Sequence, residues 1–241
     1  MRSDGILIVK DQDELIGEFI KIFADSFEAA VAERNKFSIS LSGGLTPKAI
    51  YRRLVDLSID WQKVFFFFGD ERCVLPDDPE SNFRMANEAM LSPLNIGDEH
   101  IFRWRTELRD PEAVASDYAE RIERFFAGPP CFDLCLLGLG DDAHTASLFP
   151  QTAALNETER IAVANWVRKF EKYRLTLTAT AINNSREILF IAAGAGKAGA
   201  VASVIEGERR PDDFPAQLID PPMGKVRWLI DGAAASRLTR V

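Results

Sequence analysis

The stretch that decides the fold is residues 132–150, FDLCLLGLGDDAHTASLFP. It begins with an apolar run, LCLL, that is typical of a strand buried on both faces of a parallel sheet. Gly138 and Gly140 follow directly, as turn residues do where a strand ends. Asp142 and His144 then appear within a few positions. This order predicts a buried strand that ends in a functional loop.

Apolar runs alternate with helical patterns along most of the chain. Further strands are predicted at residues 6–9, 37–41, 64–68, 160–167, 173–179, 188–192 and 226–230. Helices are predicted at about 13–34, from 46 onward, and at 82–91, 111–126 and 196–205. This alternation predicts a three-layer α/β/α fold with a mainly parallel central sheet. No linker or repeat is visible, so we expect one domain over residues 1–241.

Composition and charge limit the partners of the protein. The net charge is -8 and no tract is dense in Lys or Arg, which argues against nucleic acid and anionic membranes as partners. The N-terminal apolar stretch has only four residues, too few for a signal or membrane segment, so we expect a cytoplasmic protein. The three cysteines lack metal-ligand spacing and are expected to be reduced. A small anionic ligand stays compatible with this composition.

Four polar or glycine-rich clusters each follow a predicted strand directly. They are residues 40–47 (SLSGGLTP), 69–72 (GDER), 138–144 (GLGDDAH) and 194–197 (GAGK). The carboxyl ends of parallel strands lie on one edge of the sheet, where open α/β sheets bind ligands. We therefore expect the four clusters to form a single site.

The first and last clusters have features of an anion site. Gly43 and Gly44 let the backbone approach a ligand closely, and Thr46 is expected to cap the next helix, with Pro47 at its first position. A helix N-terminus of this kind offers free N–H groups to phosphate. Lys197 opens a helix, where the dipole disfavours a cation unless an anion is bound.

The remaining polar residues leave alternatives open. Asp70 and Arg72 belong either to the site or to a solvated charge cluster. Asn82 either caps a helix or contributes to the pocket, and Arg174 either keeps a strand edge soluble or contacts the ligand. Each of these residue types serves both roles in proteins, so the sequence alone does not separate them.

His144 differs from the other histidine, His100, which is expected to be structural or exposed. His144 stands at a strand's carboxyl end beside Asp141 and Asp142, where a carboxylate can orient the imidazole. The pattern G-x-G-x-x-A at 138–143 could instead indicate a dinucleotide site. That alternative fails because the turn comes past mid-chain and Pro150 leaves no room for the long helix that should follow.

The clusters, in their order and spacing, resemble the 6-phosphogluconolactonases. The segments that carry the resemblance are SLSGGLTP, FFFGDERCVLPDDPESNFRMA, FDLCLLGLGDDAHTASLFP, YRLTLT and AAGAGKAGAV, within about residues 35–232. The wider superfamily includes the glucosamine-6-phosphate deaminases and the ribose-5-phosphate isomerase-like proteins. Deaminases have D-E-Y and D-G-H-I-A-F-N-E-P at the corresponding places, which this chain lacks. One departure is Ala143, where the family usually has glycine.

The resemblance implies hydrolysis of 6-phospho-D-glucono-1,5-lactone in the oxidative pentose phosphate pathway, with no cofactor and no metal. It implies His144 as general base, Asp142 as its support, and Arg72 on either the oxyanion or the phosphate. The residues expected to bind substrate are Ser42, Gly43, Gly44, Thr46, Asp70, Asn82, Arg174 and Lys197. The alternatives are a non-catalytic sugar-phosphate sensor and a deaminase-like aldose–ketose isomerase. A monomer or a small homo-oligomer is expected.

Overall fold

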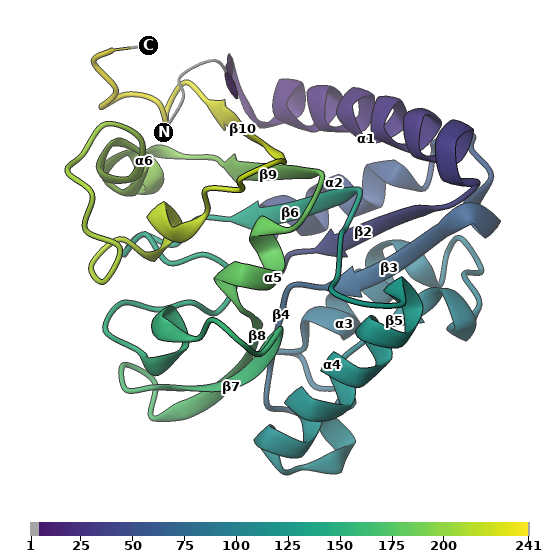
Figure 1. Cartoon of the computed structure of the whole chain (residues 1–241). Coiled ribbons are helices and arrows are strands. Elements are labelled where there is room, and N and C mark those ends of the chain that lie inside the picture. Colours follow the sequence, from purple (N-terminus) through teal and green to yellow (C-terminus); the bar gives the residue numbers. More distant parts are fainter. Residues whose placement is uncertain (1–4, 241) are drawn as a thin grey trace.

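The computed structural model describes residues 5–240 and has a seven-stranded parallel sheet as its central layer (Figure 1). Its strands are β1 (Ile6–Val9), β2 (Phe37–Leu41), β3 (Val64–Phe68), β5 (Ile101–Phe102), β6 (Leu134–Gly138), β9 (Glu187–Ala192) and β10 (Lys225–Asp231). Their order across the sheet is β1-β10-β9-β6-β2-β3-β5. Every neighbouring pair is parallel, which confirms the predicted central layer.

Helices cover both faces of this sheet (Figure 1). They are α1 (Gln12–Arg34), α2 (Leu45–Leu54), α3 (Asn82–Ala86), α4 (Pro111–Phe126), α5 (Ala179–Asn183) and α6 (Ala198–Ile205). A π-helical turn over Asn87–Leu91 continues α3, so the helix predicted at 82–91 changes its winding halfway. None of the described helices is long and apolar enough to cross a membrane.

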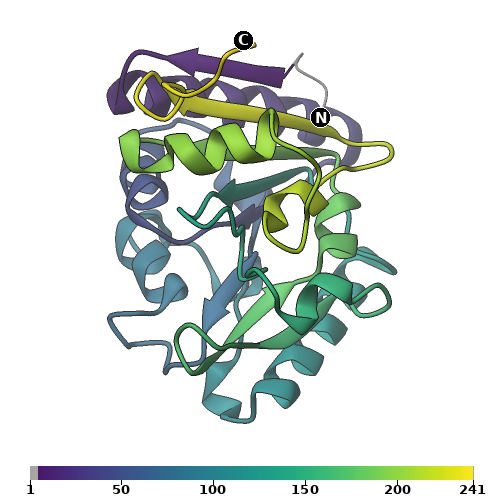
Figure 2. The same ribbon diagram turned by 90° about the vertical axis from the view of Figure 1, so that its left-hand side faces the viewer.

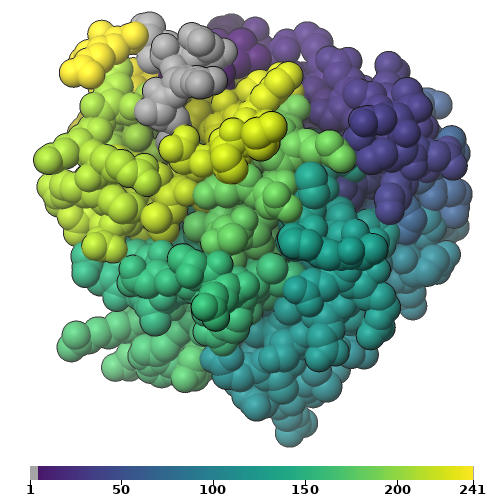
Figure 3. All heavy atoms as spheres, viewed as in Figure 1, coloured from purple at the N-terminus to yellow at the C-terminus, as the bar shows by residue number. Residues whose placement is uncertain are grey.

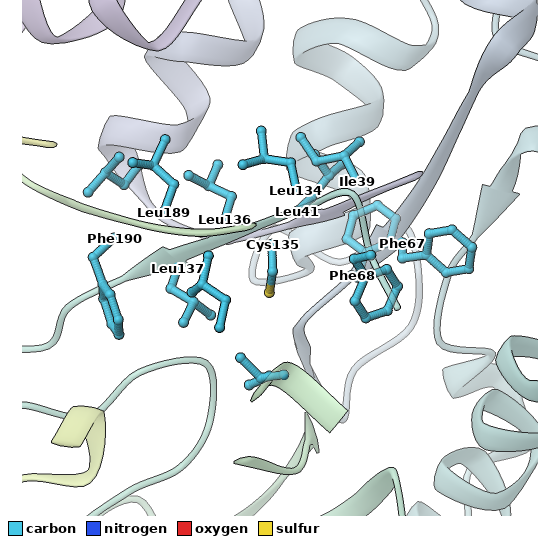
Figure 4. Close-up of a cluster of buried hydrophobic side chains, with 14 of the residues drawn as sticks. Ile39, Leu41, Phe67, Phe68, Leu134, Cys135, Leu136, Leu137, Leu189 and Phe190 are labelled. Atoms are coloured by element: carbon cyan, nitrogen blue, oxygen red, sulfur yellow. The ribbon is translucent and has the colours of Figure 1, made fainter. Parts of the chain in front are cut away.

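The apolar run at residues 134–137 is explained by the burial of β6 on both of its faces. Leu134 and Leu136 point to one face of the sheet, and Cys135 and Leu137 point to the other (Figure 4). All four side chains are fully buried or nearly so. Because successive side chains of a strand alternate between faces, only a sheet covered on both sides can use an unbroken apolar run.

A second sheet was not predicted. It is antiparallel, in the order β4-β8-β7, and consists of β4 (Asp70–Arg72), β8 (Lys172–Leu177) and β7 (Ala162–Val167). The strands predicted at 160–167 and 173–179 are present, but they pair with each other and with GDER, for which no strand was predicted. Only four residues join β7 to β8, whereas a parallel connection needs a dozen or more. Helix α4 packs on this small sheet.

One cluster of buried hydrophobic side chains includes members from the main sheet, the small sheet and the helices. In the space-filling view the teal and green segments of the small sheet and α4 continue without a break into the upper layers (Figure 3). Within residues 5–240 the two sheets and the helices therefore share one core, and the single domain over residues 1–241 stays a prediction.

Candidate active site

A pocket of about 210 Å³ lies at the carboxyl ends of the parallel strands. Figure 2 looks onto this edge of the molecule. Eight of the predicted site residues line the pocket: Ser42, Gly43, Gly44, Asp70, Arg72, Asn82, His144 and Lys197. Thus all four sequence clusters meet at one place, as the strand arrangement predicted. Asp142, Thr46 and Arg174 are not part of the pocket wall.

The loop after β6 is closed by its own backbone. The Gly140 N–H donates to the His144 carbonyl at 2.8 Å, and the Ala143 N–H donates to the Gly140 carbonyl at 3.1 Å. The Thr145 hydroxyl donates to the Gly138 carbonyl at 2.8 Å. These bonds fix the direction in which the His144 side chain leaves the loop.

Asp142 orients the imidazole. Its Oδ1 lies 2.5 Å from His144 Nδ1, and its Oδ2 accepts from the Lys169 ammonium at 3.0 Å. The hydrogen bond with His144, helped by Lys169, holds the pKa of the Asp142 carboxyl well below its usual range. Since this carboxylate can only accept, the hydrogen bond assigns the proton to Nδ1, and in the neutral imidazole Nε2 then keeps its lone pair. Phe149 stacks on the ring with centroids 4.0 Å apart.

Ser147 anchors the same loop to the small sheet. Its N–H donates to Thr176 Oγ1 at 3.2 Å, its hydroxyl donates to Asp70 Oδ2 at 2.8 Å, and its carbonyl accepts from Asn165 Nδ2 at 2.9 Å. These three partners come from β8, β4 and β7 respectively. Ser147 is buried and its hydroxyl is engaged, so its role here is to hold the loop.

The Ser42–Gly44 turn is held by a tyrosine. The Ser42 N–H donates to Tyr51 Oη at 2.9 Å, and the Tyr51 hydroxyl donates to the Ser42 carbonyl at 2.8 Å. A Cβ at Gly43 would lie 2.0 Å from Asn82 Oδ1, so only glycine allows this approach. Gly44 has φ of 113°, which glycine alone adopts readily.

The predicted helix cap at Thr46 is wrong. Helix α2 begins at Leu45, and Gly44 is the N-cap with no side chain to contribute. Thr46 is therefore the second helical residue and Pro47 the third. The positive φ of Gly44 turns the chain into the helix two residues earlier than a cap at Thr46 would.

Glu71 of the GDER cluster is buried and caps helix α3. The alternative in which residues 69–72 form a solvated charge cluster is therefore excluded. Its carboxylate accepts from the backbone N–H groups of Asn82 at 2.7 Å and Phe83 at 2.8 Å, and from the Ser81 hydroxyl at 3.1 Å. Burial raises the pKa of Glu71, and these backbone donors oppose the shift. The sequence missed this role.

Of its two open alternatives, Asn82 fulfils the pocket role, because the N-cap of α3 is Ser81. It begins α3, and its Nδ2 donates to the Asp70 carbonyl at 3.0 Å while the side chain lines the pocket.

Three cationic side chains in or near the pocket have no carboxylate partner. Among residues 5–240, Arg72, Arg174 and Lys197 take part in no ion pair. Arg72 and Arg174 are cross-strand partners. Burial, followed by the charge of Arg72, lowers the pKa of Arg174. Arg174 lies over the Phe170 ring, 5.2 Å from its centroid, outside the pocket wall. An anion in the pocket would relieve the repulsion between these cations.

His100 has the structural role that the sequence predicted. Its Nδ1 lies 3.0 Å from the Val64 carbonyl and its ring stacks on Phe65. Among the described residues, no three His, Cys, Asp or Glu side chains are grouped in a way that could hold a metal ion.

Comparison with known proteins identifies the family to which the chain belongs. A sequence profile described as glucosamine-6-phosphate isomerases/6-phosphogluconolactonase matches residues 10–228. The chain belongs to this family. A 6-phosphogluconolactonase from Synechocystis is 44% identical over 214 residues, which cover 87% of this chain and 88% of the relative. A 6-phosphogluconolactonase from Nostoc is 37% identical over 237 residues, which cover 96% and 97%.

Solved structures of the glucosamine-6-phosphate isomerase/6-phosphogluconolactonase family share the fold. The 6-phosphogluconolactonase from Trypanosoma brucei aligns with a TM-score of 0.88 at 29% identity, over 98% of both chains. A monomeric glucosamine-6-phosphate deaminase aligns with a TM-score of 0.83 at 24% identity, over 97% of this chain and 100% of its own, which shows the fold alone.

The backbone of Ala143 is left-handed, with φ of 59°. Left-handed backbone costs an alanine about 1 kcal/mol, and glycine would remove that cost. The replacement by glycine also lowers the free energy of unfolding by about 0.5–1 kcal/mol, because glycine has more conformational freedom in the unfolded chain. The Ala143 carbonyl accepts from the Ala216 N–H at 3.0 Å, so the conformation is held from outside the loop.

Ala143→Gly is therefore expected to change the free energy of unfolding by less than about 1 kcal/mol. Activity should stay the same or rise modestly, because the loop conformation and the Ala216 hydrogen bond are retained. Urea denaturation and steady-state kinetics check both values. A large loss of activity would contradict the view that residue 143 only shapes the loop.

Proposed function

We propose that the protein hydrolyses 6-phospho-D-glucono-1,5-lactone to 6-phosphogluconate, with His144 as general base. The observation that carries the proposal is the pocket of about 210 Å³ whose lining joins an Asp142-oriented imidazole with Arg72 and Lys197, two cations that lack carboxylate partners. Two relatives named 6-phosphogluconolactonase, 44% and 37% identical, support the choice of substrate. The reaction belongs to the oxidative pentose phosphate pathway.

The phosphate is proposed to bind at the N-terminus of α2. Gly43 and Gly44 offer backbone N–H groups there, whereas the Ser42 N–H is held by Tyr51, and Arg72 and Lys197 add positive charge. Arg72 also lines an adjoining pocket of about 370 Å³ together with Gly44 and Asn82. This position favours a phosphate clamp over oxyanion stabilisation for Arg72. Asp70 and Asn82 are proposed to contact sugar hydroxyls.

The lactone carbonyl would then lie near His144. Nε2 accepts a proton from the water that attacks C1, and the imidazolium is stabilised by Asp142. Collapse of the tetrahedral intermediate breaks the bond from C1 to the ring oxygen, and the imidazolium returns its proton to that oxygen. The base is regenerated in each cycle, so the step needs no other reactant than water.

We place the protein in the cytoplasm as a monomer or small homo-oligomer. The three cysteines, Cys73, Cys131 and Cys135, are all free, which fits a reducing compartment. The acidic net charge of -8 fits a small-molecule substrate better than nucleic acid.

The test is proton release on addition of freshly generated 6-phosphogluconolactone, corrected for spontaneous hydrolysis. Unphosphorylated gluconolactone is compared in parallel. The proposal predicts fast hydrolysis of the phosphorylated lactone only. If calorimetry showed binding of 6-phosphogluconate but the lactone were not turned over, the protein would be a sugar-phosphate sensor. Release of ammonia from glucosamine 6-phosphate would instead identify a deaminase.

A further inference from the structure

The hairpin between β7 and β8 contacts the catalytic loop through two side chains. At residues 168–171 the chain turns, and Lys169 Nζ lies 3.0 Å from Asp142 Oδ2. Phe170 packs edge-on against Phe149, with ring centroids 5.5 Å apart, and Phe149 stacks on His144. The Lys169 ammonium and the Phe170 ring therefore contact Asp142 and Phe149, the two side chains that hold the His144 imidazole.

We propose that Lys169 is a positioning residue that tunes His144 by sharing the charge of Asp142. The two carboxylate oxygens of Asp142 are divided between the imidazole and the ammonium. The ammonium keeps Oδ1 directed at Nδ1 and offsets part of the negative charge that would favour the imidazolium. This inference rests on the proposed role of His144 as a base, which must be neutral to accept a proton.

Removal of Lys169 leaves the other charges around the ring unchanged. These are Asp141 on the same loop, Asp70 and Arg72 on β4, Lys197 before α6, and Arg174 on β8. A variant at residue 169 therefore changes one charge at a known place. With the ammonium gone, the full charge of Asp142 acts on the ring and the protonated form becomes more stable.

The effect is moderate because solvent screens an exposed charge. The Lys169 side chain is 55% exposed, against 27% for Asp142 and 25% for His144. We expect Lys169→Met to raise the titration midpoint of the His144 imidazole by about half a pH unit at low ionic strength. The shift should shrink in about 1 M salt, where the screening length is only a few ångströms.

The experiment uses the fact that the chain contains only two histidines. NMR titration follows both imidazoles in wild type and Lys169→Met, and the loss of one resonance in His144→Gln assigns it. The His144 midpoint is expected to rise while that of His100 stays fixed. In parallel, the acid limb of kcat/KM should move to higher pH by the same amount, with little change in rate above it.

Two further variants separate tuning from a general effect of the hairpin. Lys169→Arg should restore the wild-type midpoint, because it keeps the charge. Lys172→Met removes an exposed lysine of the same hairpin whose nearest carboxylate is Glu80 at 4.0 Å, and it should leave the midpoint unchanged.

An unshifted His144 midpoint in Lys169→Met overturns the inference, as does a rate reduced equally at every pH. The NMR arm does not depend on turnover. A shifted midpoint in a protein without lactonase activity would therefore sustain the role of Lys169 and refute the proposed function.

Discussion

His144→Gln is expected to lower kcat by about 10³-fold, the effect typical of a lost general base. Glutamine retains a polar side chain but cannot take a proton from water at neutral pH. The phosphate contacts proposed for the Ser42–Gly44 turn and Lys197 are untouched, so KM should change little. Steady-state proton release on the phosphorylated lactone measures both constants.

His100→Gln is the matched control for this prediction. His100 is the other histidine, and it packs on Phe65 away from the pocket lining. This variant should melt at a lower temperature but keep the kcat of the folded enzyme. If His144→Gln retained kcat within tenfold of wild type, His144 would not be the base.

Gly140→Ala is expected to lower kcat/KM by about 10²-fold or more, although no reacting side chain is changed. A Cβ at this position would lie 2.0 Å from His144 Nδ1 and 2.8 Å from Asp142 Oδ1. Both are ends of side chains, so the fold tolerates the methyl group by moving them. The movement breaks the hydrogen bond that orients the imidazole.

Kinetics together with thermal melting distinguish this local effect from unfolding. Gly17→Ala is the control, because nothing lies within 4 Å of a Cβ there and α1 gains helix propensity. That variant should be as active as wild type and slightly more stable. A fully active Gly140→Ala enzyme would mean that the Asp142–His144 geometry does not limit the reaction.

Much of the fold could be predicted because its signals are local. The apolar runs at 64–68 and 132–137 indicated strands buried on both faces, and their polar continuations placed Arg72 and His144 at one edge. Parallel strands bring such continuations together regardless of the loops between them.

The parts that could not be predicted depend on contacts between distant segments. Nothing near Glu71 in the sequence indicates that it caps α3, and nothing near Lys169 indicates that it reaches Asp142, which is 27 residues away along the chain. The small sheet was missed because β4 has only three residues. A four-residue connection between 167 and 172 was the one signal for the antiparallel hairpin.

The anchoring of Ser147 to three strands has a consequence for motion in the enzyme. Since Asp70, Asn165 and Thr176 all hold this residue, the loop that carries His144 is tied to the small sheet as well as to β6, from which it continues. Asp70 belongs to β4, the strand that also carries Arg72. We therefore expect a displacement of β4 to carry the loop with it, so that the spacing between His144 and Arg72 is maintained.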